Sequence, residues 1–258
     1  MRIPFALVLL CGTVVGCADA RTPDDAVADT DAVAAAVADT IVIADGRVFA
    51  EAEDVSDWGG RPMLQAAFAA ARAHWQAQDP DYEEETQVMS VAEGSFSETG
   101  VSQYAILYLI SSWPRCCPKM GIAVVQDGEL VRNVAFEAPT YGLVAVPDLD
   151  GDGLDELALT GSFGMGGENS TSVTLVSLAD SGLRTWGGEM IQYDACGAMQ
   201  EGGTASRITA VPGPAFTIER FARASCESGQ YEAGGPPEPF EFTAPAPEDE
   251  LSVELSIR

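Results

Sequence analysis

The sequence predicts a mainly β protein of antiparallel sheets with one amphipathic helix near the start of the folded region. Short runs of β-branched, aromatic and aliphatic residues recur between clusters of Gly, Pro, Asp and Ser, which is the pattern of strands joined by turns. The pair Asp127-Gly128 between two such runs is a favoured two-residue hairpin turn. Only one segment has convincing helical periodicity. Together these observations predict the fold class.

The helix is expected to begin at Arg61-Pro62, because proline is favoured in the first turn, and to end near Asp79-Pro80. His74 lies at the edge of its apolar stripe with no second imidazole or acidic partner in the sequence, so we expect a partly buried packing residue. The stripe consists of Met63, Leu64, Ala67, Phe68, Ala71 and Trp75.

Strands are expected along the rest of the folded region, ending in the alternating stretch 251–257. The Gly-rich stretch 161–170, which carries Phe163 and Met165, is expected to be an exposed connection, either a functional loop or the tip of a long hairpin. The other expected strands are 87–91, 104–111, 121–126, 129–136, 143–146, 157–160, 171–178, 183–190, 207–211 and 216–221.

The stretch 148–156 carries the clearest chemistry in the chain. Asp148, Asp150 and Asp152 stand at every second position of one tight turn. Their carboxylates are hard oxygen ligands, of which calcium takes about six to eight. The backbone carbonyl of Leu154 and the carboxylate of Glu156 would complete the ligand set. The sequence therefore predicts a calcium site. The alternative is an acidic turn in which Asp and Gly are present only because turns favour them.

This motif resembles the FG-GAP and VCBS-type calcium-loop repeats, because the pattern D-x-D-x-D-G-x-x-E lies between two short apolar runs. The twelfth loop position is Leu159, where a helical calcium hand has a bidentate Glu. The resemblance implies sheets of propeller-blade type. Since the chain has one intact copy and no preceding FG and GAP pair, the expected architecture is a partial or irregular propeller-like fold or a β-sandwich.

A second, degenerate copy of the motif, without charge at the ligand positions, is found when Gly100 is aligned with Gly153. This alignment predicts a degenerate repeat at about 88–137 and a calcium-loop repeat at about 141–190; chance similarity is the alternative. Ser95, Ser97, Thr99 and Gln103 then take the places of Asp148, Asp150, Asp152 and Glu156.

We expect residues 1–16 to be a secretory signal, since their apolar run is too short for a membrane span. Val14-Val15-Gly16-Cys17 resembles a bacterial lipobox, which implies lipidation of Cys17 and a membrane anchor. Ala18 is not the Asp that retains lipoproteins at the inner membrane, so an outer-membrane lipoprotein is implied. Cleavage after Ala20 would instead give a secreted protein. Residues 17–40 have the composition of a disordered tether, and 41–258 are expected to form one domain.

A formal net charge of −27 argues against nucleic-acid partners. In an oxidising compartment the remaining cysteines are expected to form disulfides, each of the adjacent Cys116 and Cys117 reaching one of Cys196 and Cys226. The alternative is a soft-metal or redox site made by Cys116, Cys117 and Met120.

The sequence thus favours a lipid-anchored envelope protein with a non-enzymatic binding or structural role, stabilised by calcium, with an envelope or extracellular protein or glycan as partner. The alternative is an extracytoplasmic hydrolase that uses two carboxylates, for which Asp194, Glu201 and Glu219 lie near strand ends.

Overall fold

The computed structural model describes residues 40–48, 61–78, 87–112, 117–179, 182–198, 202–211, 215–243 and 253–256. The expected signal peptide, Cys17 and residues 17–39 of the expected tether lie outside these ranges. Within them, no helix combines the length and the apolar character needed to cross a membrane.

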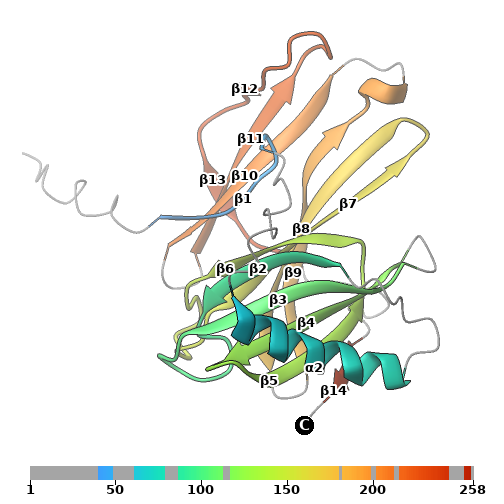
Figure 1. Cartoon of the computed structure of the whole chain (residues 1–258). Coiled ribbons are helices and arrows are strands. Elements are labelled where there is room, and N and C mark those ends of the chain that lie inside the picture. The colour runs from blue at the N-terminus through green and yellow to red at the C-terminus, as the bar shows by residue number, and fades with distance from the viewer. Residues whose placement is uncertain are drawn as a thin grey trace, which may run out of the picture. The chain divides into compact units, whose positions relative to one another are not determined.

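Two antiparallel sheets and one α-helix make up the described part of the chain (Figure 1). The small sheet has the order β14 (Val253–Ser256), β5 (Glu129–Glu137), β4 (Lys119–Gln126), β3 (Gln103–Ser111) and β2 (Val88–Gly94). The large sheet has the order β12 (Glu232–Ala233), β11 (Ala215–Arg223), β10 (Gly203–Val211), β9 (Gly182–Asp194), β8 (Glu168–Ala179), β7 (Glu156–Met165) and β6 (Thr140–Val146). In addition, β1 (Ile41–Asp45) pairs with β10 and β13 (Glu238–Phe240) pairs with β11. The predicted mainly β, antiparallel fold class is confirmed.

The helix α2 spans Pro62–Gln78, as the position of Pro62 and the apolar spacing predict. Its apolar face packs on the small sheet, around the fully buried Tyr108. Met63 was expected in this stripe but is 63% exposed, and its side chain lies beside the turn at Gly128. His74 is partly exposed and packs edge-on against Trp75, with ring centroids 4.7 Å apart. The buried helix residues are Leu64, Ala67, Phe68, Ala71 and Trp75.

The other face of the small sheet packs against β6, β7 and β8 of the large sheet. Apolar residues at alternate positions of both sheets form this core, as in a β-sandwich. They include Leu107, Ile122, Val134 and Phe136 from the small sheet and Leu143, Leu157, Leu159 and Val176 from the large one.

A second core lies within the large sheet, where Ile43 and Ala44 of β1 pack with buried residues of β6 to β11. The strand β1 was not among the expected strands. Its five residues give little periodicity, and its partner β10 is distant in the sequence, so only the tertiary structure identifies it.

The stretch 161–170 forms a hairpin, with β7 continuing to Met165 and β8 beginning at Glu168. Gly166 and Gly167 have φ of 64° and 90°, the left-handed backbone that a tight two-residue turn requires. Of the two expectations for this stretch, the long hairpin is the one the structure shows. The Asp127-Gly128 turn also forms as predicted, with φ of 52° and 84°.

Candidate metal site

The aspartate loop, residues 148–156, connects β6 to β7. One carboxylate oxygen from each of Asp148, Asp150 and Asp152 lies within 4.8 Å of the other two. Asp148 is partly exposed and the other two are exposed, so a cation could reach all three from solvent. The three residues that the sequence singled out are therefore brought together, and they form a donor set suited to a hard cation.

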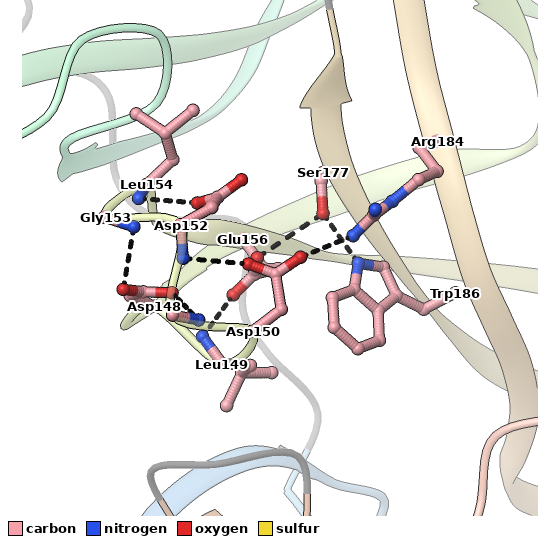
Figure 2. Close-up of polar contacts among 11 residues, drawn as sticks. Asp148, Leu149, Asp150, Asp152, Gly153, Leu154, Glu156, Ser177, Arg184 and Trp186 are labelled. Carbon is pink, nitrogen blue, oxygen red and sulfur yellow. Dashed lines mark hydrogen bonds and ion pairs between the residues drawn. The ribbon is translucent and has the colours of Figure 1, made fainter.

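Backbone N–H groups of the loop hold these carboxylates in place (Figure 2). Asp148 accepts hydrogen bonds from the N–H groups of Gly151 at 2.7 Å and Gly153 at 2.9 Å. Asp150 Oδ1 accepts from Asp152 N at 3.2 Å, and Asp152 Oδ1 accepts from Leu154 N at 2.8 Å. These bonds fix the carboxylate positions within one turn, which reduces the ordering needed when a cation binds.

Glu156 ends the loop and is 1% exposed. Its Oε2 accepts a hydrogen bond from Leu149 N at 2.8 Å, and Ser177 Oγ donates to its Oε1 at 3.4 Å. The pKa of this carboxyl is raised to about 7: burial is the largest cause, the bond from Leu149 opposes it, and repulsion from the three aspartates adds to it. Glu156 is thus buried beside the group of three carboxylates and not part of it, although the charges of the aspartates act on its carboxyl.

Arg184 of β9 contacts this loop, and Trp186 of the same strand contacts Arg184 and Ser177; neither was among the predicted site residues. Arg184 Nη2 lies 2.7 Å from Asp150 Oδ2. The same guanidinium lies over the ring of Trp186, 5.0 Å from its centroid, and Trp186 Nε1 donates to Ser177 Oγ at 2.6 Å. No local pattern could have indicated these contacts, because the pairing of β7 with β8 and β8 with β9 creates them.

The hydroxyl loop, residues 95–103, connects β2 to β3 and is the aligned copy, with neutral side chains at the positions of the proposed ligands. Gln103 is fully buried, and its Oε1 accepts from Phe96 N and Ser97 N, both at 2.9 Å. In the alignment on Gly100, Gln103 matches Glu156 and Phe96 matches Leu149. The same side-chain to backbone hydrogen bond therefore closes both loops, and Gly100 and Gly153 both have positive φ, of 71° and 86°.

The two loops touch each other. Asp155 Oδ2 accepts from Ser95 N at 2.7 Å, and Asp155 N donates to Ser95 O at 2.7 Å. Its Oδ1 accepts from Asp148 N at 3.2 Å, so one side chain bonds both loops. A Cβ added to Gly153 would lie 2.6 Å from Thr99 Cγ2, which shows how closely the loops pack. Asp155 was not among the predicted site residues, because it stands outside the alternating ligand pattern.

The structure corrects the expected cysteine pairing. Cys196 and Cys226 form a disulfide with each other, across 30 residues of sequence. The pairing of β9, β10 and β11 brings these two segments together, whereas Cys117 precedes β4 in the small sheet. Cys116 lies outside the described residues. Met120, the thioether of the alternative soft-metal site, is 1% exposed within the hydrophobic core.

The acids considered for hydrolysis have separate partners. Asp194 accepts from Cys196 N and contacts Arg223, and these interactions hold its pKa below the ordinary value. Glu219 pairs with Arg207, and Glu201 lies outside the described residues. A cavity of about 190 Å³ beside β1 is lined mainly by aliphatic groups, with Asp45 as the one carboxylate in that lining.

Comparisons of the chain with protein-family models, with curated proteins and with solved structures find no match. Function is therefore inferred from the aspartate loop and its surroundings.

Proposed function

We propose that the chain is a lipid-anchored protein of the bacterial cell envelope with a non-enzymatic structural or binding role, and that one calcium ion in the aspartate loop stabilises its β domain. The observation that carries the metal site is the convergence of three carboxylates within 4.8 Å in a loop already ordered by its own backbone. The ligands would be the carboxylates of Asp148, Asp150, Asp152 and Glu156 and the carbonyl of Leu154.

Calcium is the metal that this donor set supports best. The proposed ligands are all oxygen atoms, whereas zinc and copper sites usually include nitrogen or sulfur. Magnesium demands stricter octahedral geometry and keeps more of its water. The spacing also resembles FG-GAP and VCBS-type loops, in which calcium rigidifies a connection between strands.

The ion would offset repulsion among the carboxylates and fix the connection between β6 and β7. Because Asp155 bonds both loops, this effect would extend to the hydroxyl loop and so to the contact between the two sheets. A ligand that binds the folded state alone stabilises it by mass action, by about 2.7 kcal/mol at a concentration one hundred times Kd.

Calcium titration by calorimetry, together with thermal melts in calcium and in chelator, tests this role. We expect chelation to lower Tm of the wild type and Asp150→Ala to remove both the binding heat and the calcium-dependent rise in Tm. Asp127→Asn is the matched control, because it removes an acid from the β4–β5 turn, where Asn tolerates the positive φ. An unchanged melting curve on chelation would contradict a structural calcium ion.

The anchor is proposed from the lipobox-like sequence ending at Cys17. Lipidation there, followed by the tether, would hold the domain at the outer membrane within reach of an envelope or extracellular protein or glycan. We expect labelled fatty acid to be incorporated into the wild type and not into Cys17→Ala when both are expressed in a diderm bacterium. Equal labelling of both, or of neither, would contradict the anchor and leave the secreted form as the explanation.

A further inference from the structure

The contact between Arg184 and Asp150 joins a fixed positive charge to a proposed calcium ligand (Figure 2). The guanidinium comes from β9, outside the loop, and its Nη2 is 2.7 Å from Asp150 Oδ2. The other oxygen of this carboxylate accepts the N–H of Asp152. Both oxygens of Asp150 therefore already have partners within the protein, and one of these partners carries a charge of the same sign as a metal ion.

Beside the hydroxyl loop, the position reached through the corresponding strand pairing carries the opposite charge. Arg184 is the cross-strand partner of Ser177, whose hydroxyl contacts Glu156. Around the hydroxyl loop, Gln126 contacts Gln103, and the cross-strand partner of Gln126 is Glu129. The cation Arg184 thus lies beside the aspartate loop. At the corresponding position, the anion Glu129 lies beside the hydroxyl loop, which has no acidic cluster. This difference links Arg184 to the aspartates and not to the shared sheet architecture.

We propose that Arg184 is an internal competitor of the metal: it occupies Asp150 when calcium is absent and leaves that carboxylate when calcium binds. The inference rests on the proposed calcium site. Arg184 then stabilises the loop without metal, by neutralising part of its charge, and weakens calcium binding through charge repulsion and through the contact that must be broken. The affinity would be set by a residue that does not itself ligate the ion.

Trp186 provides a direct signal of this exchange. Its ring lies under the Arg184 guanidinium, and its Nε1 bonds Ser177, which in turn contacts Glu156. Movement of Arg184 away from Asp150 would change the surroundings of the indole. Calcium should therefore change the tryptophan fluorescence of the wild type, and Trp186→Phe should remove that change.

The test compares calcium binding by the wild-type chain, Arg184→Gln, Arg184→Lys and Arg220→Gln, using calorimetry and fluorescence in parallel. Arg220 is the matched control, because its side chain is 56% exposed against 55% for Arg184 and it pairs with Glu238, away from the aspartate loop. We expect Arg184→Gln to lower Kd by about threefold to tenfold. Arg184→Lys, which keeps the charge, should stay closer to the wild type, and Arg220→Gln should stay within about twofold of it.

Thermal melts of the same variants give a second readout. We expect Arg184→Gln to lower Tm in chelator while leaving Tm at saturating calcium close to that of the wild type. The rise in Tm caused by calcium would then be larger in Arg184→Gln than in the wild type or in Arg220→Gln.

Each outcome decides between the two proposals. If the wild type binds calcium and Arg184→Gln binds it equally or more weakly, the competitor role is wrong, while the calcium site stands. If only Arg184→Gln binds calcium, the competition is confirmed and a resident ion in the wild type is contradicted. If neither binds calcium, both proposals are overturned.

Discussion

The aspartate loop and the hydroxyl loop share one backbone arrangement and differ in charge. In each, a fully or almost fully buried side chain at the start of a strand accepts an N–H from the buried residue seven positions earlier. The hydroxyl loop closes in this way with the neutral amide of Gln103. A carboxylate at Glu156 is therefore not needed to close the turn, and the proposed cation would account for the charge of the aspartate loop.

The surroundings of the two buried side chains also differ. Gln103 Nε2 donates to Ser97 Oγ at 2.8 Å and to Gln126 Oε1 at 2.7 Å. Both the nitrogen and the oxygen of its amide therefore have hydrogen-bond partners. Glu156 has one good backbone donor and one long contact from Ser177. The hydroxyl loop satisfies its polar groups internally, whereas the aspartate loop keeps negative charge that the protein alone compensates only in part. Exchanging the two residues should therefore have opposite effects.

The largest effect is expected for Gln103→Glu. The substitution removes both amide donors and places a carboxylate beside Gln126 Oε1, so we expect a loss of about 3 kcal/mol in the free energy of unfolding at pH 8. Urea denaturation measures the loss, which should shrink at low pH as the carboxyl protonates. Gln87→Glu, at an exposed position before β2, is the control and should stay within about 0.5 kcal/mol of wild type. Wild-type stability of Gln103→Glu would contradict the proposed contrast.

A smaller effect of opposite sign is expected for Glu156→Gln in chelator. Since the pKa of Glu156 is raised from 4.5 to about 7 in the folded state, that state retains the proton over this range while the unfolded state loses it. The contribution of this group to stability is therefore present below pH 4.5 and is lost as pH rises to 7. The loss is at most about 3 kcal/mol.

Glu156→Gln keeps an acceptor for Leu149 N and should lack this slope, so that at pH 8 in chelator it is more stable than the wild type. Its calcium binding should be weaker, because a charged ligand is lost. Urea denaturation between pH 4.5 and 8 checks the slope. The same slope in both proteins would show that Glu156 is not the group responsible.

The smallest effect is expected for Asp155→Ala, which tests the contact between the loops. This variant leaves the N–H groups of Ser95 and Asp148 without their carboxylate acceptor, and we expect a loss of about 1 to 2 kcal/mol. Hydrogen exchange should accelerate at Ser95, in the loop that was not mutated. Ser102→Ala, at the aligned position of the hydroxyl loop, is the control, because its hydroxyl donates only to an exposed glutamate among the bonds described. Unchanged exchange at Ser95 in Asp155→Ala would contradict the coupling.

Local signals predicted much of the fold. The extent of α2 followed from Pro62 and the apolar spacing, and the β4–β5 turn followed from Asp127-Gly128. The pairing of Cys196 with Cys226 and the existence of β1 could not be predicted in this way. Both depend on β10 and its neighbours, so the contacts join segments far apart in the sequence.

The sequence by itself determined where the acidic donors stand, because alternation within one tight turn is a local property that places three carboxylates close together in almost any fold. It also determined the second loop, through the spacing of Gly100 and Gln103. Only the tertiary structure decided what surrounds those donors. Strand pairing brought Arg184 to Asp150, and sheet packing buried Glu156 and brought Asp155 to Ser95. The balance of charge at the site depends on these long-range contacts.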